Sequence, residues 1–230
     1  DATCFNQADG QVTISVDGGS PISAPQYIYQ LFDAGGVLIN IEPFTTNNSH
    51  TFSNLSAGAY SIEVRDLENC DILPVNFEIE EPSQIQVEET ISNYNGFGVS
   101  CNGGDDGFIN IDNTISDSGG PYTYLWNGPG GFFSPNQNIS DLLAGDYNLI
   151  VVDNGEAPPC QENFTFTVTE PNPISVSLEA TSNTSVCFGE LANIDIDVLG
   201  GTGPGTYSYQ WTASNGGIIP VGQENNQNLD

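Results

Sequence analysis

Basic residues are almost absent from this chain. Arg65 is its only Lys or Arg, against 30 acidic residues, so the formal net charge is −29 at pH 7. Nucleic acid is excluded as a partner, because binding to phosphates requires Lys and Arg to displace counterions. An anionic membrane surface is excluded on the same ground. The acidity is typical of a solubility device on a long exposed protein, and specific cation binding is the alternative.

Residues for catalysis are scarce as well. His50 is the only histidine, and it lies in a polar run from Thr45 to His50 that is typical of a loop. Without Lys no Schiff base can form. No candidate nucleophile lies beside a candidate base in an arrangement that recurs along the sequence. No apolar run is long enough to span a membrane. We therefore expect no enzyme, no certain cofactor and no direct membrane insertion.

One motif occurs three times and organises the sequence. Each copy has a cysteine, an alternating strand, a Gly-Gly pair and an aromatic run. The two fuller copies continue with Ala-Gly-x-Tyr, a second cysteine and Glu-Pro. The opening cysteines are Cys4, Cys101 and Cys187, and the second cysteines are Cys70 and Cys160. A period of about 90 residues fits a small β-sandwich domain better than a solenoid repeat.

The repeat predicts three modules with boundaries at 1–82, 83–171 and 172–230. The first module lacks its leading strand and the third lacks its C-terminal strands, so we expect a segment of a longer polypeptide. The linkers after the Glu-Pro pairs are only two or three residues long. Linkers this short leave little freedom, so we expect neighbouring modules to stack end to end.

Alternation of apolar and polar residues with period two dominates each module, and no stretch has helical periodicity. This pattern predicts an all-β fold of tandem immunoglobulin-like β-sandwich modules, with about seven short strands in a complete module. The expected core residues are Val12, Ile14, Tyr29, Tyr60, Ile62 and Val64, and then Ile109, Ile111, Tyr124, Trp126, Tyr147 and Leu149.

Two aromatic features have structural interpretations. The Tyr-x-Tyr-x-Trp run could bind sugar, but a sandwich needs large residues on its central strand, which favours core packing. Tyr60 and Tyr147 each follow Ala-Gly at the start of a late strand. They resemble the tyrosine corner, in which the hydroxyl ties a crossover loop to the sheet.

The cysteines bracket equivalent parts of the two fuller modules. This pattern predicts the disulfides Cys4–Cys70 and Cys101–Cys160, with Cys187 unpaired inside the segment. Disulfides indicate an oxidising, extracellular compartment. Zinc is disfavoured, because no closely spaced cysteine pair exists.

Calcium is the one metal that the sequence leaves open. Asp9 and Asp106 precede glycines in equivalent turns, and Asp66 and Asp153 end equivalent strands. If each module's cysteines were bonded, Asp9 would lie near Asp66, and Asp106 near Asp153, which suits Ca²⁺ at the module poles. The alternative is that these residues form ordinary Asp-Gly and Asx turns.

The motifs quoted above resemble the SprB-like repeat over positions 4–82 and 101–171, and the third copy resembles PKD-like modules. The first copy departs from the pattern, with Leu31 where Trp is usual and an insertion around Thr45 to His50. SprB-like repeats recur in giant surface adhesins of gliding Bacteroidetes. The resemblance implies export by the type IX secretion system, display on the cell surface, and attachment or gliding motility.

Two classes of function follow. One is a structural segment of a very long secreted adhesin or filament, whose partners are the neighbouring modules of the same chain. The other is a binding module for polysaccharide or for other surface proteins and cells. Phe132 and Phe133, between glycines and a proline, are the best candidates for contact with such a ligand.

Overall fold

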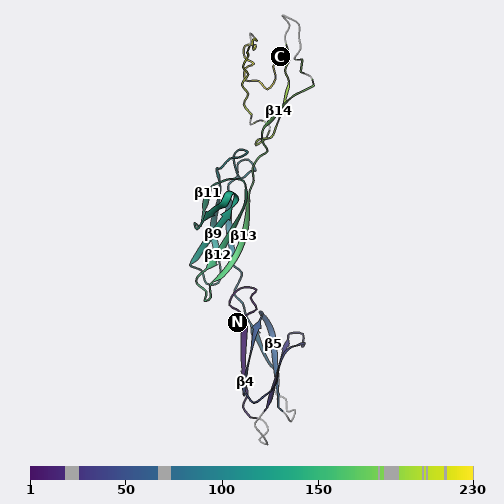
Figure 1. Cartoon of the computed structure of the whole chain (residues 1–230), viewed down its shortest axis with the longest axis vertical. Helices are drawn as coiled ribbons and strands as arrows, with labels where there is room; N and C mark the ends of the chain where they lie inside the picture. Colours follow the sequence, from purple (N-terminus) through teal and green to yellow (C-terminus); the bar gives the residue numbers. More distant parts are fainter. Residues whose placement is uncertain are drawn as a thin grey trace. The chain divides into compact units, whose positions relative to one another are not determined.

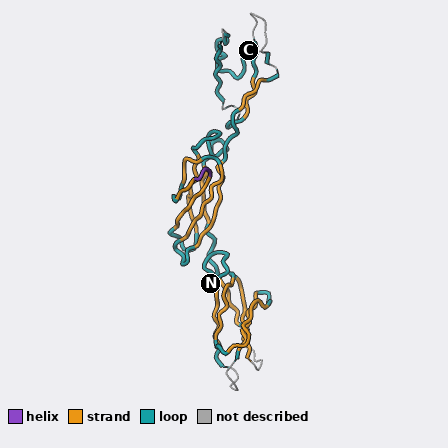
Figure 2. The backbone as a smooth tube through the Cα atoms, in the orientation of Figure 1, coloured by secondary structure: helices purple, strands orange, loops and turns teal. Residues whose placement is uncertain are grey.

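The computed structural model describes residues 1–18, 26–66, 74–180, 182–183, 192–203, 205, 207–214 and 217–229. Its contacts divide the chain into two compact units. Unit 1 comprises Asp1–Val87, Asn113–Thr123 and Ile150–Asn163, and unit 2 comprises Glu88–Asp112, Tyr124–Leu149 and Phe164–Asp230. Within the described residues, the regular elements are strands apart from one short 3-10 turn, so the predicted all-β fold is confirmed (Figure 2).

Unit 1 contains two sheets from the first module. Its strands are β1 (Gly10–Ser15), β2 (Tyr27–Asp33), β3 (Leu38–Thr45), β4 (Ser49–Leu55), β5 (Gly58–Asp66) and β6 (Val75–Ile79). Strand β1 pairs with β4, and the other sheet has the order β3-β2-β5-β6. Figure 1 labels β4 and β5, one from each sheet. The pairing is antiparallel, as period-two alternation predicts.

The core of this first sandwich is built from the inward face of both sheets. Tyr29 and Leu31 on β2 and Phe52 on β4 are almost completely buried in one cluster. Val12 and Ile14 are half-buried and pack against that cluster. The alternation along β2 therefore separates a packed face from a wet one, as in an antiparallel sandwich.

The second module has seven strands, which agrees with the expected number. They are β7 (Gln86–Ile91), β8 (Gly107–Ile115), β9 (Tyr122–Gly128), β10 (Phe132–Ser134), β11 (Ile139–Leu142), β12 (Gly145–Asp153) and β13 (Cys160–Val168). The 3-10 turn η1 (Pro129–Gly131) joins β9 to β10. The sheets have the orders β10-β9-β12-β13 and β11-β8-β7, the three-plus-four arrangement of an immunoglobulin-like sandwich (Figure 1).

Large side chains fill the core of unit 2. Trp126 is fully buried and packs its ring against Phe166, with centroids 5.6 Å apart. Ile109 and Ile111 on β8, and Leu149 on β12, are also buried. The residues expected in this core are confirmed apart from Tyr124, which is only half-buried.

Both predicted tyrosine corners are present. The Tyr147 hydroxyl donates to the carbonyl oxygen of Leu143 at 3.0 Å, and the Tyr60 hydroxyl donates to that of Ser56 at 2.8 Å. Each bond joins a residue on the late strand to the loop four residues earlier. The late strands β5 and β12 are thereby fixed where they enter their sheets.

His50 is not in a loop, contrary to the sequence interpretation. It lies on β4, with its ring 5.6 Å from that of Tyr29 and 4.6 Å from that of Phe52. Packing between aromatic rings therefore overrides the polar character of the surrounding sequence. The turn that separates β3 from β4 is confined to residues 46–48.

The third copy of the motif contributes two further strands to unit 2. Strands β14 (Ser175–Leu178) and β15 (Ile196–Leu199) form an antiparallel pair. Gly200 and Gly201 follow β15 with φ of 90° and 60°, a backbone conformation that favours glycine. No helix that could cross a bilayer occurs among the residues that the structure describes.

Candidate functional site: the Cys4–Cys160 junction

The disulfide of the structure joins Cys4 to Cys160, with Cα atoms 5.6 Å apart. Both predicted pairings are therefore wrong: Cys4 does not bond Cys70, and Cys101 does not bond Cys160. Cys101 is free and exposed. Cys70 and Cys187 lie outside the described residues, so the expectation that Cys187 is unpaired stays a prediction. The observed bond joins the first cysteine of one copy of the motif to the second cysteine of the next copy.

The geometry of β13 explains the correction. Cys160 begins this strand, whereas the backbone amides of Gly98 and Val99 donate to Thr169, just beyond its other end. Cys101 is therefore about a full strand length from Cys160. A nine-residue strand spans roughly 27 Å, and disulfide Cα atoms must lie within about 7 Å.

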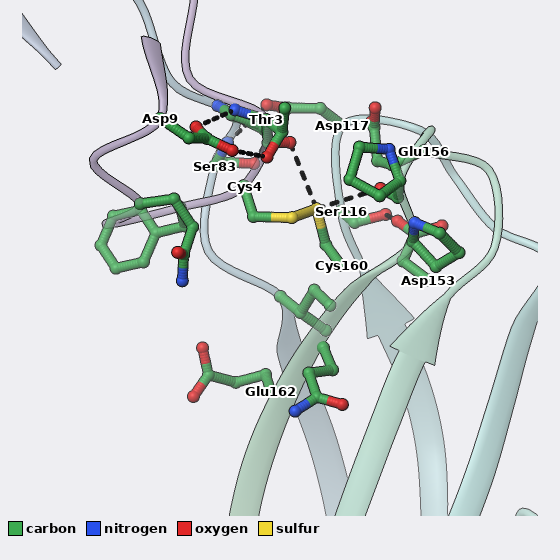
Figure 3. Close-up of a pocket in the computed structure, with 17 residues that line it drawn as sticks. Thr3, Cys4, Asp9, Ser83, Ser116, Asp117, Asp153, Glu156, Cys160 and Glu162 are labelled. Atoms are coloured by element: carbon green, nitrogen blue, oxygen red, sulfur yellow. Dashed lines mark hydrogen bonds between the residues drawn. A yellow bond between two sulfur atoms is a disulfide. The ribbon is translucent and has the colours of Figure 1, made fainter. Parts of the chain in front are cut away.

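A cavity of about 310 Å³ surrounds the disulfide within unit 1 (Figure 3). Residues on three segments of the chain line it: the loop around Cys4, the linker at Pro82 and Ser83, and the end of the second sandwich. The Cys160 sulfur lies 3.3 Å from the carbonyl oxygen of Thr3. A bonded sulfur carries no proton, so this is a packing contact and not a hydrogen bond.

The carboxylate of Asp9 fixes the Cys4 loop, defined as residues 1–10. Its Oδ1 accepts the backbone N–H of Thr3 at 2.9 Å, and its Oδ2 accepts the Thr3 hydroxyl. The Thr3 hydroxyl, followed by its backbone N–H, lowers the pKa of Asp9. Both bonds stabilise the charged form of the carboxylate, so the loop is held by an ionised aspartate at neutral pH.

An equivalent arrangement occurs in the Cys101 loop, defined as residues 98–107. Asp106 accepts the backbone N–H of Ser100 at 2.9 Å, and the backbone and then the side chain of Ser100 lower its pKa. The amides of Gln7 and Gly104 donate to the carbonyl oxygens of Cys4 and Cys101 at 3.1 and 3.0 Å. Both loops therefore share these two internal hydrogen bonds.

Two further aspartates hold the other walls of the cavity. Asp117 accepts both the backbone N–H and the hydroxyl of Ser83 in the linker, at 2.6 and 2.7 Å, and the backbone bond is the main cause of its lowered pKa. Asp153 is buried and accepts hydrogen bonds from Ser116, Ser118 and the amide of Gly155. Burial raises the pKa of Asp153, but the hydrogen bonds from Ser116, Ser118 and the Gly155 amide together outweigh it and leave the pKa lowered.

The predicted calcium residues are brought together differently from the expectation. Asp9 lines the cavity with Asp153 and not with Asp66. Asp66 ends β5, and Asp106 lies in the Cys101 loop. No group of three or more His, Cys, Asp or Glu suited to a metal occurs within the described part of the chain. The carboxylates of Asp9, Asp106 and Asp153 accept protein hydrogen bonds instead, and calcium at these residues stays a prediction.

The two Glu-Pro pairs have a role that the sequence interpretation missed. Glu81 accepts the backbone N–H of Asn6 at 2.5 Å, and Glu170 accepts that of Gly103 at 2.6 Å. Each glutamate thus ties the end of a module to its own cysteine loop. Its recurrence before proline in both modules was the available signal, but the sequence interpretation used the pairs only to mark the linkers.

The two phenylalanines proposed as ligand contacts differ in their surroundings. The ring of Phe132 packs edge-on against Tyr147, with centroids 5.3 Å apart. Phe133, next to it on β10, is 65% exposed. Phe132 is therefore a packing residue, and Phe133 is the one available to a ligand.

Comparison with protein families identifies the repeat. The family described as SprB repeat matches residues 1–36 and 99–131, which confirms the resemblance for these two segments. The first segment contains the Cys4 loop, and the second contains the Cys101 loop apart from Gly98. No curated protein matches the chain.

Solved structures give only distant likenesses. Three domains of the outer capsid protein Hoc of bacteriophage RB49 are 15% identical, with a TM-score of 0.33, and the match covers 86% of this chain and 66% of that one. A C-terminal fragment of intimin is 14% identical, with a TM-score of 0.31 and coverage of 72% and 59%. An amphioxus IgVJ-C2 molecule is 16% identical, with a TM-score of 0.28 and coverage of 72% and 99%. These scores carry no argument about function, and the fold assignment rests on the sheet order.

Proposed function

We propose that this chain is a structural segment of a secreted cell-surface adhesin or filament, in which consecutive modules are fastened to each other. The disulfide between Cys4 and Cys160 carries the proposal, because it covalently joins two copies of the motif. The SprB repeat in both copies supports the assignment to an adhesin. The partners of each module are then its neighbours in the same chain, and the segment itself performs no catalysis.

Two further observations support display outside the cell. A disulfide persists in an oxidising compartment, such as the cell surface, and is rare in the cytosol. The net charge of −29 limits adhesion of the segment to the cell's own anionic surface. Export through the type IX secretion system, and a role in surface attachment or gliding motility, complete the proposal.

Deletion of the gene that encodes this chain tests the proposal. We expect reduced attachment or spreading of the cells, with loss of surface label from an antibody raised against residues 1–230. Normal attachment and spreading, together with the product in the cytoplasm of wild-type cells, would contradict it. An in-frame deletion of only the segment, with surface display of the remainder checked, separates the contribution of these modules.

Direct binding of a polysaccharide or another surface protein is the second candidate, and the exposure of Phe133 favours it. Exposed aromatic rings supply rigid apolar contact area. Binding of the purified protein to polysaccharide-coated surfaces would fall in Phe133→Ala but not in Ile115→Ala, which removes another exposed apolar side chain. Equal binding by both variants and the parent would rule out Phe133 as the contact.

A further inference from the structure

The covalent path through this chain is much shorter than its sequence. Cys4 lies near the beginning of the chain, and its disulfide leads directly to Cys160, a sequence separation of 156. Residues 5–159 therefore form a closed covalent loop. That loop includes every strand of the first sandwich and all strands of the second except β13.

We propose that the Cys4–Cys160 disulfide is a tension-bearing bypass, which keeps residues 5–159 from extending when the chain is pulled from its ends. Tension that enters at Asp1 reaches Cys4, crosses the two sulfur atoms to Cys160 and continues along β13. The hydrogen bonds of the first sandwich lie outside this path. They do not have to resist the force, however weak each bond is.

Strand β13 is suited to the remaining part of the path. It runs from Cys160 to Val168 and is the edge strand of the sheet β10-β9-β12-β13. A β-strand is already close to its maximum length, at about 3.3 Å per residue against a limit of roughly 3.6 Å. Pulling on both ends of β13 therefore gains little length, and the strand acts as a strut from the disulfide to the Glu170-Pro171 linker.

The hydrogen bonds around the disulfide keep the bypass short at rest. Asp9 and Glu81 hold the Cys4 loop through Thr3 and Asn6, and Asp117 holds the linker through Ser83. These bonds position the bypass, while the covalent bond bears the load. The biological value of the bypass rests on the proposed function, because an attachment protein is pulled between a cell and a surface.

Single-molecule pulling on the purified protein, with handles at residues 1 and 230, tests the proposal. The oxidised protein is expected to release only the length of the residues after β13, about 200 Å. With dithiothreitol, Cys4 and Cys160 become thiols, and the reductant supplies two electrons and two protons as it closes to its cyclic disulfide. The released length should then rise by about 540 Å.

Two variants that remove the disulfide, and one control variant, make the result specific. Cys160→Ser should release the longer length without any reductant, and Cys4→Ser should match it. Cys101→Ser removes a free, exposed cysteine and should pull like the parent protein. Far-ultraviolet circular dichroism before pulling shows whether each variant retains its strands.

The alternative pairing, Cys4 with Cys70, predicts a different gain in released length on reduction. A Cys4–Cys70 bond would hide only about 230 Å, so a reductant-dependent gain of that size would overturn the proposal. Release of the full length by the oxidised protein would overturn it as well. The proposed function is tested separately, in cells, by gene deletion. The bypass can therefore be wrong while the proposed function holds, and the reverse.

Discussion

The Cys4 loop and the Cys101 loop share three backbone-amide hydrogen bonds and differ in covalent state. In each loop an aspartate accepts a hydrogen bond from the backbone amide six residues before it. The glutamate of a Glu-Pro pair accepts a hydrogen bond from a second backbone amide. Cys4 is nevertheless bonded to Cys160, whereas Cys101 is an exposed thiol. The loop conformation is therefore set by the hydrogen bonds and does not need the disulfide.

The disulfide adds a connection that hydrogen bonds of this kind cannot match. A backbone hydrogen bond contributes about 1 kcal/mol net, and the bonds at Asp9 and Glu81 stay within one module and its linker. The Cys4–Cys160 bond reaches a different copy of the motif. The comparison separates local positioning, which both loops have, from covalent fastening, which in this structure only the Cys4 loop has.

The largest expected effect is the loss of the disulfide. Cys160→Ser should lower the free energy of unfolding by up to about 5 kcal/mol, because closing a loop of this length restricts the unfolded chain. Urea unfolding, followed by tryptophan fluorescence and circular dichroism under non-reducing conditions, gives the change.

Cys101→Ser is the matched control, and its unfolding midpoint should equal that of the parent. The comparison fails if the two serine variants are equally stable. Peptide mapping without reduction adds a direct check. It should recover Cys4 linked to Cys160 and an alkylated Cys101, and a Cys101–Cys160 peptide would contradict the structure.

The next effect concerns Asp153, which supports one wall of the junction cavity. Asp153→Ala should cost about 1–3 kcal/mol of stability, because the half-buried hydroxyl groups of Ser116 and Ser118 lose their acceptor. Asp105→Ala, at an exposed aspartate, should change the urea midpoint little. Equal midpoints for both variants would show that Asp153 is not a structural acceptor.

The fold was predictable because it depends on local pattern. Alternation along β2, β5 and β12 identified the buried faces, and the Ala-Gly-x-Tyr motif identified both tyrosine corners. His50 shows the limit of that approach, because its burial depends on Tyr29, which lies on another strand. No property of residues 45–50 alone indicates this contact.

The error in the Cys101–Cys160 pairing was predictable in principle from strand parity. Five strands, β8 to β12, separate the loop of Cys101 from Cys160. Each antiparallel strand reverses the direction of the chain, so an odd number places the two cysteines at opposite ends of a sandwich. A bond between Cys101 and Cys160 is thereby excluded, and a bond from Cys160 to another copy is allowed.

A smaller effect tests the shared hydrogen bonds. Glu81→Ala and Glu170→Ala each remove one acceptor of a backbone amide and should each cost about 1 kcal/mol. The two losses should be similar, because the two loops are built alike. Hydrogen exchange at the amides of Asn6 and Gly103 reports each loss separately. Loss of protection at Asn6 but not at Gly103 would show that the loops differ beyond their cysteines.

The smallest expected effect is the acid sensitivity of the two aspartates. The pKa values of Asp9 and Asp106 are lowered in the folded protein, whereas an aspartate in an unfolded chain titrates near 3.9. The folded state therefore binds these protons less readily, and its stabilisation is complete above about pH 5. It declines as the pH falls through the unfolded value toward the lowered one. Asp9→Asn and Asp106→Asn should each flatten the fall in melting temperature between pH 5 and pH 2.5, and the double variant should flatten it further. The melting temperatures of the variants could instead fall with pH as steeply as that of the parent. That outcome would mean that the hydrogen bonds from Thr3 and Ser100 do not favour the ionised carboxylates.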